Sequence, residues 1–109
     1  MNIEEVKIEI YIPEEFIERL IKGFNKIGAC KIGDYDNCAS VTDVLGYWRP
    51  LDGANPYEGT VNELSREKEC KVEVRCKFEY VKDAVEVIKK IHPYEEPVYN
   101  IVPLLNHLF

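Results

Sequence analysis

Two segments of the chain alternate between apolar and polar residues, as half-buried β-strands do. The first covers residues 6–12 and the second covers residues 70–78. Their apolar positions are Val6, Ile8, Ile10, Ile12, Cys70, Val72, Val74, Cys76 and Phe78. Charged residues and Tyr11 occupy the positions between them. We therefore expect two strands that each bury one face and expose the other face to solvent.

Two other segments repeat apolar residues at the spacing of an amphipathic helix. The first helix is expected to start after Pro13 and to end at Gly28, because proline suits a first helical turn and glycine accepts the left-handed C-cap. The second is expected from about residue 82 to residue 91, ahead of Pro93. The apolar positions of the two helices are Phe16, Ile17, Leu20, Ile21, Phe24, Ile27, Val81, Ala84, Val85, Ile88 and Ile91.

The remaining segments complete a recognisable order. Residues 38–49 suit a strand in which Gly46 is expected to mark a bulge, and residues 98–102 suit a last strand. A long loop rich in proline and glycine covers residues 50–59, and long ordered loops are often functional. The order βαββαβ predicts an α+β, ferredoxin-like domain, with an antiparallel four-stranded sheet and both helices on one face. The 109 residues fit one such domain, residues 1–109.

The sheet face without helices must meet water or another chain. Its expected side chains are Lys7, Glu9, Tyr11, Lys71, Glu73, Arg75 and Lys77. These mixed charges can pair across neighbouring strands, which is compatible with a solvated face. The alternative is an interface between symmetry-related copies. Aromatic residues of the kind enriched at interfaces favour it, namely Tyr47, Trp48, Tyr57, Tyr94 and Tyr99.

Composition narrows the class of protein. The net charge is −6 and no basic tract is present, which argues against a nucleic-acid partner. No apolar run approaches the roughly 18 residues of a membrane span. The first residues lack the basic and then apolar pattern of a signal peptide. We therefore expect a cytoplasmic protein whose four cysteines remain thiols.

The cysteines are the first candidates for metal ligation. Neither the pair Cys30 and Cys38 nor the pair Cys70 and Cys76 has the spacing of a zinc or redox motif. Cys70 and Cys76 fall on the buried side of a strand, which favours core packing.

The polar turn at residues 33–37 is the second candidate for a metal site. It holds Asp34 and Asp36 but lacks the glycine and glutamate of a calcium loop. Asp and Asn side chains that cap their own backbone are the favoured interpretation. No metal or other cofactor is therefore assigned, and a divalent metal stays an alternative at Cys30, Asp34, Asp36 and Cys38.

Residues 92–97 form the most distinctive segment, because they place an imidazole and two carboxylates between prolines. In one interpretation His92 is a general base oriented by Glu95 or Glu96. In the other, His92 has a structural or binding role at a helix C-terminus, where the helix dipole favours the imidazolium. No nucleophile or oxyanion turn accompanies this segment. We favour the second interpretation and assign no catalytic residue.

Residues 28–38, 46–56 and 92–99 together resemble the inserted domain of the Nif-three-like proteins, the family of dinuclear-metal-centre hexamers. The resemblance covers nearly the whole chain in order, although the family often has histidine at the position of Lys31. It implies the fold of the trimeric PII and CutA proteins, and CutA carries a turn similar to residues 94–97. In that family the metal ligands belong to the domains flanking the insert. The chain therefore resembles the insert alone, without the metal site or its hydrolase activity.

The resemblance implies a non-enzymatic, homotrimeric PII/CutA-like binding or regulatory module, with a small ligand or ion held in clefts between subunits. The residues expected to line these clefts are Gly33, Asp34, Tyr35, Asn37, Asn55, Tyr57, His92, Tyr94, Glu95 and Glu96. A first alternative is divalent-metal binding by analogy with CutA, with ligands from Cys30, Asp34, Asp36, Cys38, Glu95 and Glu96. Further alternatives are an accessory part of a metal-dependent hydrolase and an enzyme with His92 as its base.

Overall fold

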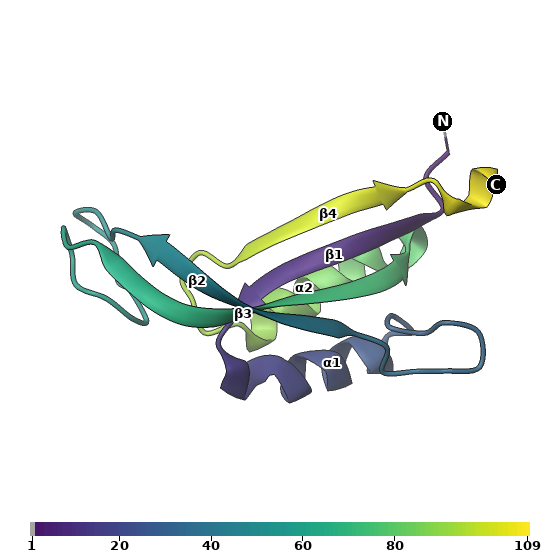
Figure 1. The fold of residues 1–109 in the computed structure, drawn as a ribbon, viewed down its shortest axis with the longest axis horizontal. Coiled ribbons are helices and arrows are strands. Elements are labelled where there is room, and N and C mark those ends of the chain that lie inside the picture. Colours follow the sequence, from purple (N-terminus) through teal and green to yellow (C-terminus); the bar gives the residue numbers. More distant parts are fainter. Residues whose placement is uncertain (1) are drawn as a thin grey trace.

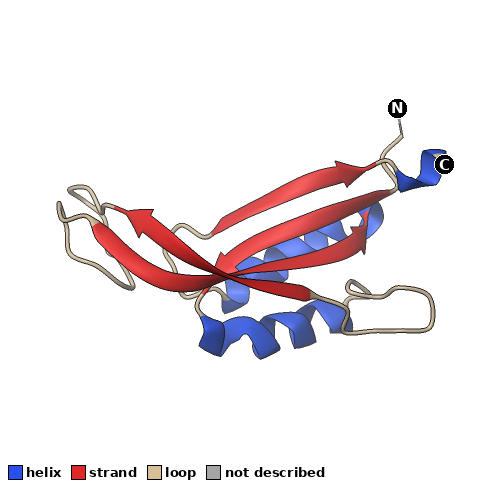
Figure 2. Cartoon of the chain, viewed as in Figure 1, coloured by secondary structure: helices blue, strands red, loops and turns tan. Residues whose placement is uncertain are grey.

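The computed structural model describes residues 2–109 and has the predicted order of strands and helices (Figures 1 and 2). The elements are β1 (Glu5–Ile12), α1 (Ile17–Lys26), β2 (Ser40–Trp48), β3 (Ser65–Lys77), α2 (Val81–Ile91) and β4 (Val98–Leu104). Short 3-10 turns lie before each helix and after β4, at Glu14–Phe16, Phe78–Tyr80 and Asn106–Leu108. The prediction of an α+β, ferredoxin-like fold is confirmed.

The sheet is fully antiparallel, with the strand order β2-β3-β1-β4. The register between β2 and β3 runs without interruption from the pair Ser40–Glu73 to the pair Trp48–Ser65. The expected bulge at Gly46 is therefore wrong. A β-carbon at Gly46 would collide with the carboxylate of Glu69 on β3, so the glycine makes room for this side chain.

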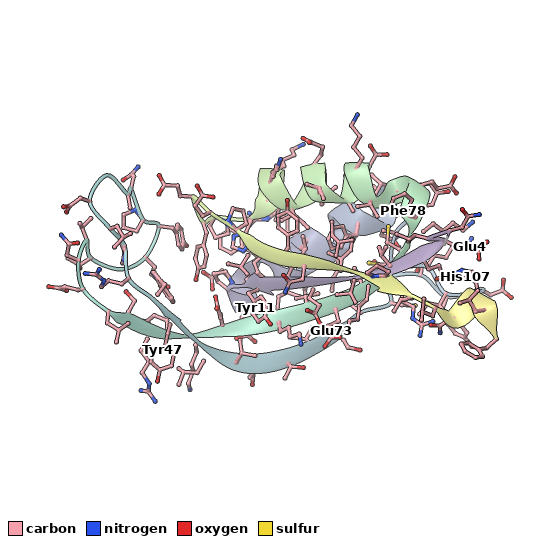
Figure 3. The ribbon with its side chains drawn as sticks, turned by 90° about the horizontal axis from the view of Figure 1, so that it is seen from above. Glu4, Tyr11, Tyr47, Glu73, Phe78 and His107 are labelled. Carbon is pink, nitrogen blue, oxygen red and sulfur yellow. The ribbon has the colours of Figure 1, made fainter. Side chains whose placement is uncertain are left out.

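The core lies between the sheet and the two helices, which cover the same face of the sheet (Figure 1). The apolar positions of β1 and β3 predicted to face inward are buried, except for Phe78. Phe78 lies in the 3-10 turn after β3 and is 50% exposed (Figure 3). The alternation thus predicted one strand position too many, because the chain turns toward α2 directly after Lys77.

The face of the sheet without helices carries an ion network of Lys7, Glu9, Lys71 and Glu73, as the cross-strand pairing predicts. Glu73 is labelled in Figure 3. The Lys7 ammonium lies 3.1 Å from Glu73 and 3.2 Å from Glu9, and Lys71 lies 3.4 Å from Glu9. The hydrogen bond from Lys7 lowers the pKa of the Glu9 carboxyl. These charges on the middle strands therefore find partners within the chain.

The edges of the sheet differ from its centre. Strands β2 and β4 each pair on one side only, and both expose apolar side chains. These are Val41, Leu45, Tyr47, Val98, Ile101 and Val102. Strands β2 and β3 continue past the rest of the sheet as a long hairpin, and the α1–β2 loop lies at the opposite end of the molecule from the β2–β3 loop (Figure 1). Across residues 2–109, neither helix is long and apolar enough to cross a bilayer.

Candidate functional site

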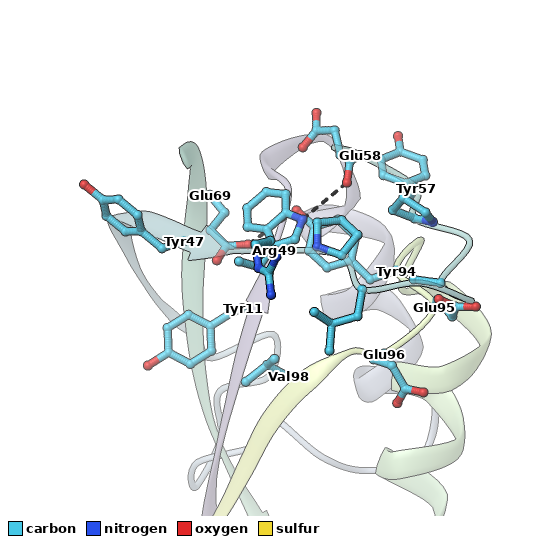
Figure 4. A pocket seen from close by; sticks show the side chains of 15 residues that line it. Tyr11, Tyr47, Arg49, Tyr57, Glu58, Glu69, Tyr94, Glu95, Glu96 and Val98 are labelled. Carbon is cyan, nitrogen blue, oxygen red and sulfur yellow. Dashed lines mark hydrogen bonds between the residues drawn. The ribbon is translucent and has the colours of Figure 1, made fainter. Parts of the chain in front are cut away.

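A cavity of about 400 Å³ lies where the β2–β3 loop meets residues 92–97, the segment between α2 and β4 (Figure 4). This volume falls within the range of small-molecule sites. The aromatic side chains of its wall are Tyr11, Tyr47, Trp48, Tyr57 and Tyr94. Four glutamates and one arginine also line it, namely Glu58, Glu69, Glu95, Glu96 and Arg49. The cavity is thus an aromatic hollow whose charged groups are mostly acidic.

Tyr94 is the centre of an aromatic cluster that joins the loop to the domain. Its ring centroid lies 6.0 Å from that of Trp48, 5.9 Å from that of Tyr57 and 4.8 Å from that of His92. Tyr57 also packs edge-on against Phe16 at 6.3 Å. Ring pairs at such distances stabilise beyond the area that they bury. The cluster therefore holds the far end of the hairpin against the turn before α1.

Hydrogen bonds fix the β2–β3 loop internally. The Trp48 indole N–H donates to the carbonyl of Glu58 at 3.3 Å, and the Asn62 side chain donates to Asp52 at 2.7 Å. Gly59 has a φ of +99°, and a β-carbon there would lie 2.5 Å from Ser65 Oγ and 3.2 Å from Trp48 Nε1. Only glycine allows this conformation and this close approach without strain. The loop therefore has a defined shape over Trp48.

A further hydrogen bond joins the loop to residues 92–97. The backbone N–H of Asn55 donates to Glu95 Oε1 at 3.1 Å. Two segments about forty positions apart in the sequence thereby form one rim of the cavity. The proline-bounded segment and the long loop, which each stood out in the sequence, thus meet at one place.

His92 lies behind this rim rather than in the cavity. It is 6% exposed, and both of its ring nitrogens are engaged within the chain. Nδ1 accepts the backbone N–H of Tyr94 at 3.1 Å, so Nε2 carries the proton and donates to the carbonyl of Tyr11 at 2.6 Å. Burial lowers the pKa of this imidazole. This shift runs against the imidazolium that the helix dipole was expected to favour, because burial penalises the charged ring and Nδ1, which would take the extra proton, already accepts an N–H.

Glu69 is the polar group that sequence analysis missed. Its side chain is half-buried beside Gly46, and the Tyr94 hydroxyl donates to its Oε2 at 3.4 Å. Burial raises the pKa of the Glu69 carboxyl, although the bond from Tyr94 opposes this shift. Burial and the nearby carboxylates also raise the pKa of Tyr94. The signal available in the sequence was Gly46, since a glycine within a strand often marks the close approach of another group.

Apart from His92, the predicted ligand-binding residues fall into two groups. Tyr57, Tyr94, Glu95 and Glu96 line the cavity, and the backbone of Asn55 binds Glu95 at its rim. The α1–β2 loop, which carries Gly33, Asp34, Tyr35 and Asn37, lies at the other end of the molecule (Figure 1). Within one chain the two groups do not share a cleft.

The turn at residues 33–37 has internal hydrogen bonds of the kind expected for turn chemistry. The backbone N–H of Asn37, at a φ of +54°, donates to Asn25 at 3.0 Å, and its side chain donates to Asp36 at 2.9 Å. Burial raises the pKa of the adjacent Cys30 to about 12, which disfavours the thiolate that binds metals. Nowhere in residues 2–109 do three His, Cys, Asp or Glu side chains gather in a way that could hold a metal ion.

Comparison with protein-family models gives no match. Curated proteins named GTP cyclohydrolase 1 type 2 homolog do match. The one from Bacillus subtilis is 36% identical over 98 residues, which cover 90% of this chain and 26% of that protein. The one from Mycobacterium tuberculosis is 33% identical over 96 residues, which cover 88% of this chain and 25% of that protein. The chain thus spans about a quarter of the length of these relatives.

Solved structures give the same relationship. A Bacillus cereus protein related to NIF3 superposes with a TM-score of 0.82 and 26% identity over 95% of this chain and 26% of that one. The divalent ion tolerance protein CutA1 from Ehrlichia chaffeensis superposes with a TM-score of 0.69 and 17% identity over 97% and 86% of the two chains. The CutA likeness shows the fold. The chain is therefore similar to one CutA-like segment of these Nif-three-like (NIF3) relatives, a segment that makes up about a quarter of their length.

Proposed function

We propose that the chain is a non-enzymatic binding module of the PII/CutA type, which assembles as a homotrimer and takes a small ligand in the cavity around Tyr94. The observation that carries this proposal is the cavity itself. Its wall combines β1, the ends of the β2–β3 hairpin and residues 92–97, and specific contacts hold these parts together. A preformed, aromatic hollow with a few polar groups is typical of a ligand site.

The chemistry of the cavity favours binding over catalysis. The part of its wall within residues 2–109 includes no Ser, Thr, Cys, Lys or His, so a hydroxyl, thiol or amine nucleophile with a histidine base has no residues there. His92, the candidate base, has both ring nitrogens occupied. A general base must reach the proton that it removes, and here the imidazole faces the chain's own backbone.

Self-association is supported by the edges of the sheet. Both edge strands leave backbone groups unpaired and expose apolar side chains, and such edges readily add a strand from another chain. In a closed ring of copies, a neighbour's turn at residues 33–37 would be available to the cavity at the other end of the first copy. A cytoplasmic location without membrane or nucleic-acid partners belongs to the same proposal, and the net charge of −6 supports the absence of a nucleic-acid partner.

A second candidate function is that of an accessory segment within a larger hydrolase. The chain matches about a quarter of the length of proteins named GTP cyclohydrolase 1 type 2 homolog. In this case the cavity would serve regulation or substrate capture for catalytic parts elsewhere. Divalent-metal binding has less support, because no cluster of suitable ligands forms among residues 2–109.

The test is native mass spectrometry combined with light scattering on the purified chain and two variants. Tyr94→Ala should keep the fold, by circular dichroism, and lose either the retained ligand or the trimer. Tyr35→Ala, in the distant turn, should do the same only if a neighbour's turn completes the site. A Tyr94→Ala variant with unchanged mass and unchanged ligand content would contradict the proposal.

A further inference from the structure

The charges of the cavity are strongly one-sided. Four glutamates are among its lining residues, whereas Arg49 is the single cation of its described wall. Glu58, Glu95 and Glu96 are exposed at the rim, and Glu69 is half-buried (Figure 4). A site walled by one sign of charge raises the local concentration of ligands of the opposite sign. The field therefore favours a cation and opposes phosphate-bearing or carboxylate ligands.

Glu69 has an unused hydrogen-bonding capacity. Within residues 2–109, its one hydrogen bond comes from the Tyr94 hydroxyl, to Oε2 and at the long distance of 3.4 Å. Oε1 lies where a side chain at position 46 would otherwise be, and Gly46 has no side chain that could donate a hydrogen bond to it. An ionised carboxylate offers about four acceptor sites. The half-buried Glu69 is thus placed to accept N–H groups from a ligand.

The aromatic side chains determine the shape of the ligand that fits. The rings of Trp48 and Tyr57 are each tilted against the ring of Tyr94, at centroid distances of 6.0 and 5.9 Å, and all three residues line the cavity. Aromatic faces attract cations, and they stack on flat ring systems. The volume of about 400 Å³ suits a small heterocycle rather than an extended chain.

We infer that the cavity recognises a planar cation that bears N–H donors, such as an amidinium or a protonated amino-heterocycle, with its donors on Glu69 and its ring among Trp48, Tyr57 and Tyr94. This inference rests on the proposed function, because it names the class of ligand for the same cavity. An amidinium matches a carboxylate with two parallel N–H···O bonds, as the arginine side chain does.

The experiment uses three probes with the same ring: benzamidine, benzyl alcohol and benzoate. Trp48 is the only tryptophan in the chain, so its fluorescence reports on the cavity directly. Benzamidine should change this fluorescence saturably, and benzoate should bind at least about tenfold more weakly. Saturation by benzoate or benzyl alcohol at equal or lower concentration would overturn the ligand class, as would the absence of any saturable response to benzamidine.

Variants that remove a negative or a positive charge from the cavity make the test more specific. Glu69→Gln keeps the size of the side chain and should weaken benzamidine at least about tenfold while leaving benzyl alcohol nearly unchanged. Glu69→Asp keeps the negative charge on a shorter side chain, and it should reduce the affinity for benzamidine less than Glu69→Gln does. Arg49→Gln should tighten benzamidine, and Glu18→Gln, on the exposed side of α1, should change nothing. A Glu69→Gln variant that binds benzamidine as the original chain does would refute the inference.

The two levels of the proposal fail in different ways. If benzoate or benzyl alcohol fills the cavity better than benzamidine, the ligand class is wrong, although the cavity still binds small molecules. If native mass spectrometry finds a ligand-free monomer and no probe alters Trp48 fluorescence, the binding module itself is refuted together with its ligand class.

Discussion

Replacing His92 by alanine should destabilise the fold by about 3 kcal/mol. The substitution removes two hydrogen bonds and leaves the Tyr11 carbonyl and the Tyr94 N–H without their partner. Each unsatisfied buried group costs about 1–3 kcal/mol, and the ring contact with Tyr94 contributes about 0.5–1.5 kcal/mol. Tyr11 and Tyr94 are half-buried, so water can replace part of the loss. We therefore expect a cost in the lower part of the combined range.

Urea unfolding followed by Trp48 fluorescence measures this cost at one fixed protein concentration, because assembly would otherwise shift the midpoint. With a typical slope of about 1.5 kcal/mol per molar urea, the midpoint should fall by about 2 M. The matched control is His107→Ala, which removes the chain's other histidine, whose Nδ1 lies 3.6 Å from the Glu4 carboxylate. It should cost less than about 1 kcal/mol.

The pH dependence gives an independent check. Burial lowers the pKa of His92 in the folded chain below the usual 6.5. As the pH falls below about 6.5, His92 therefore takes up a proton in the unfolded chain before it does so in the folded chain. The free energy of unfolding decreases with falling pH until the pH lies below the pKa of His92 in the folded chain. When the pH is lowered from about 7.5 to about 5.5, the original chain and His107→Ala should both lose the free energy of unfolding that the neutral His92 contributes. The His92→Ala variant should not show this loss. Equal stabilities of His92→Ala and the original chain at both pH values would refute the assignment of both ring nitrogens.

Three further outcomes follow from the site. Gly46→Ala should displace Glu69 and weaken benzamidine binding, while costing about 1 kcal/mol or less in urea unfolding, because the displaced group is the end of a flexible side chain. Gly59→Ala should cost about 1–3 kcal/mol and raise the exposure of Trp48 to an added quencher, because the loop must leave its left-handed conformation; an unchanged quenching constant would contradict this. A thiol reagent should modify one cysteine per chain rapidly, and Cys38→Ser should abolish the fast phase, because the other three cysteines are buried.

The strands and helices of the core were predictable because burial on one face imposes a period on the sequence. Residues 6–12 and 17–26 follow that period closely, and the structure has β1 and α1 there. The first five residues of β3, 65–69, were missed because they pair only with β2, outside the helix-covered core. There the chain has no apolar alternation to detect.

The segments that form the site were predictable from local sequence, but the contacts between them were not. Residues 50–59 and 92–97 stand out locally through their prolines, glycines and aromatic residues, and both border the cavity. Their contact through Asn55 and Glu95 joins positions far apart in the sequence, and no local pattern encodes it. Glu69 looks like an ordinary charged residue at the start of a strand. Its role depends on the space left by Gly46 on the neighbouring strand.

The central claim is that copies of this chain assemble and hold a small molecule beside Tyr94. Native mass spectrometry of the protein as purified, at micromolar concentration and without added ligand, tests it most directly. The account predicts a species of three times 12.7 kDa that carries a small, dissociable excess mass. A well-folded species of 12.7 kDa without any excess mass would contradict it.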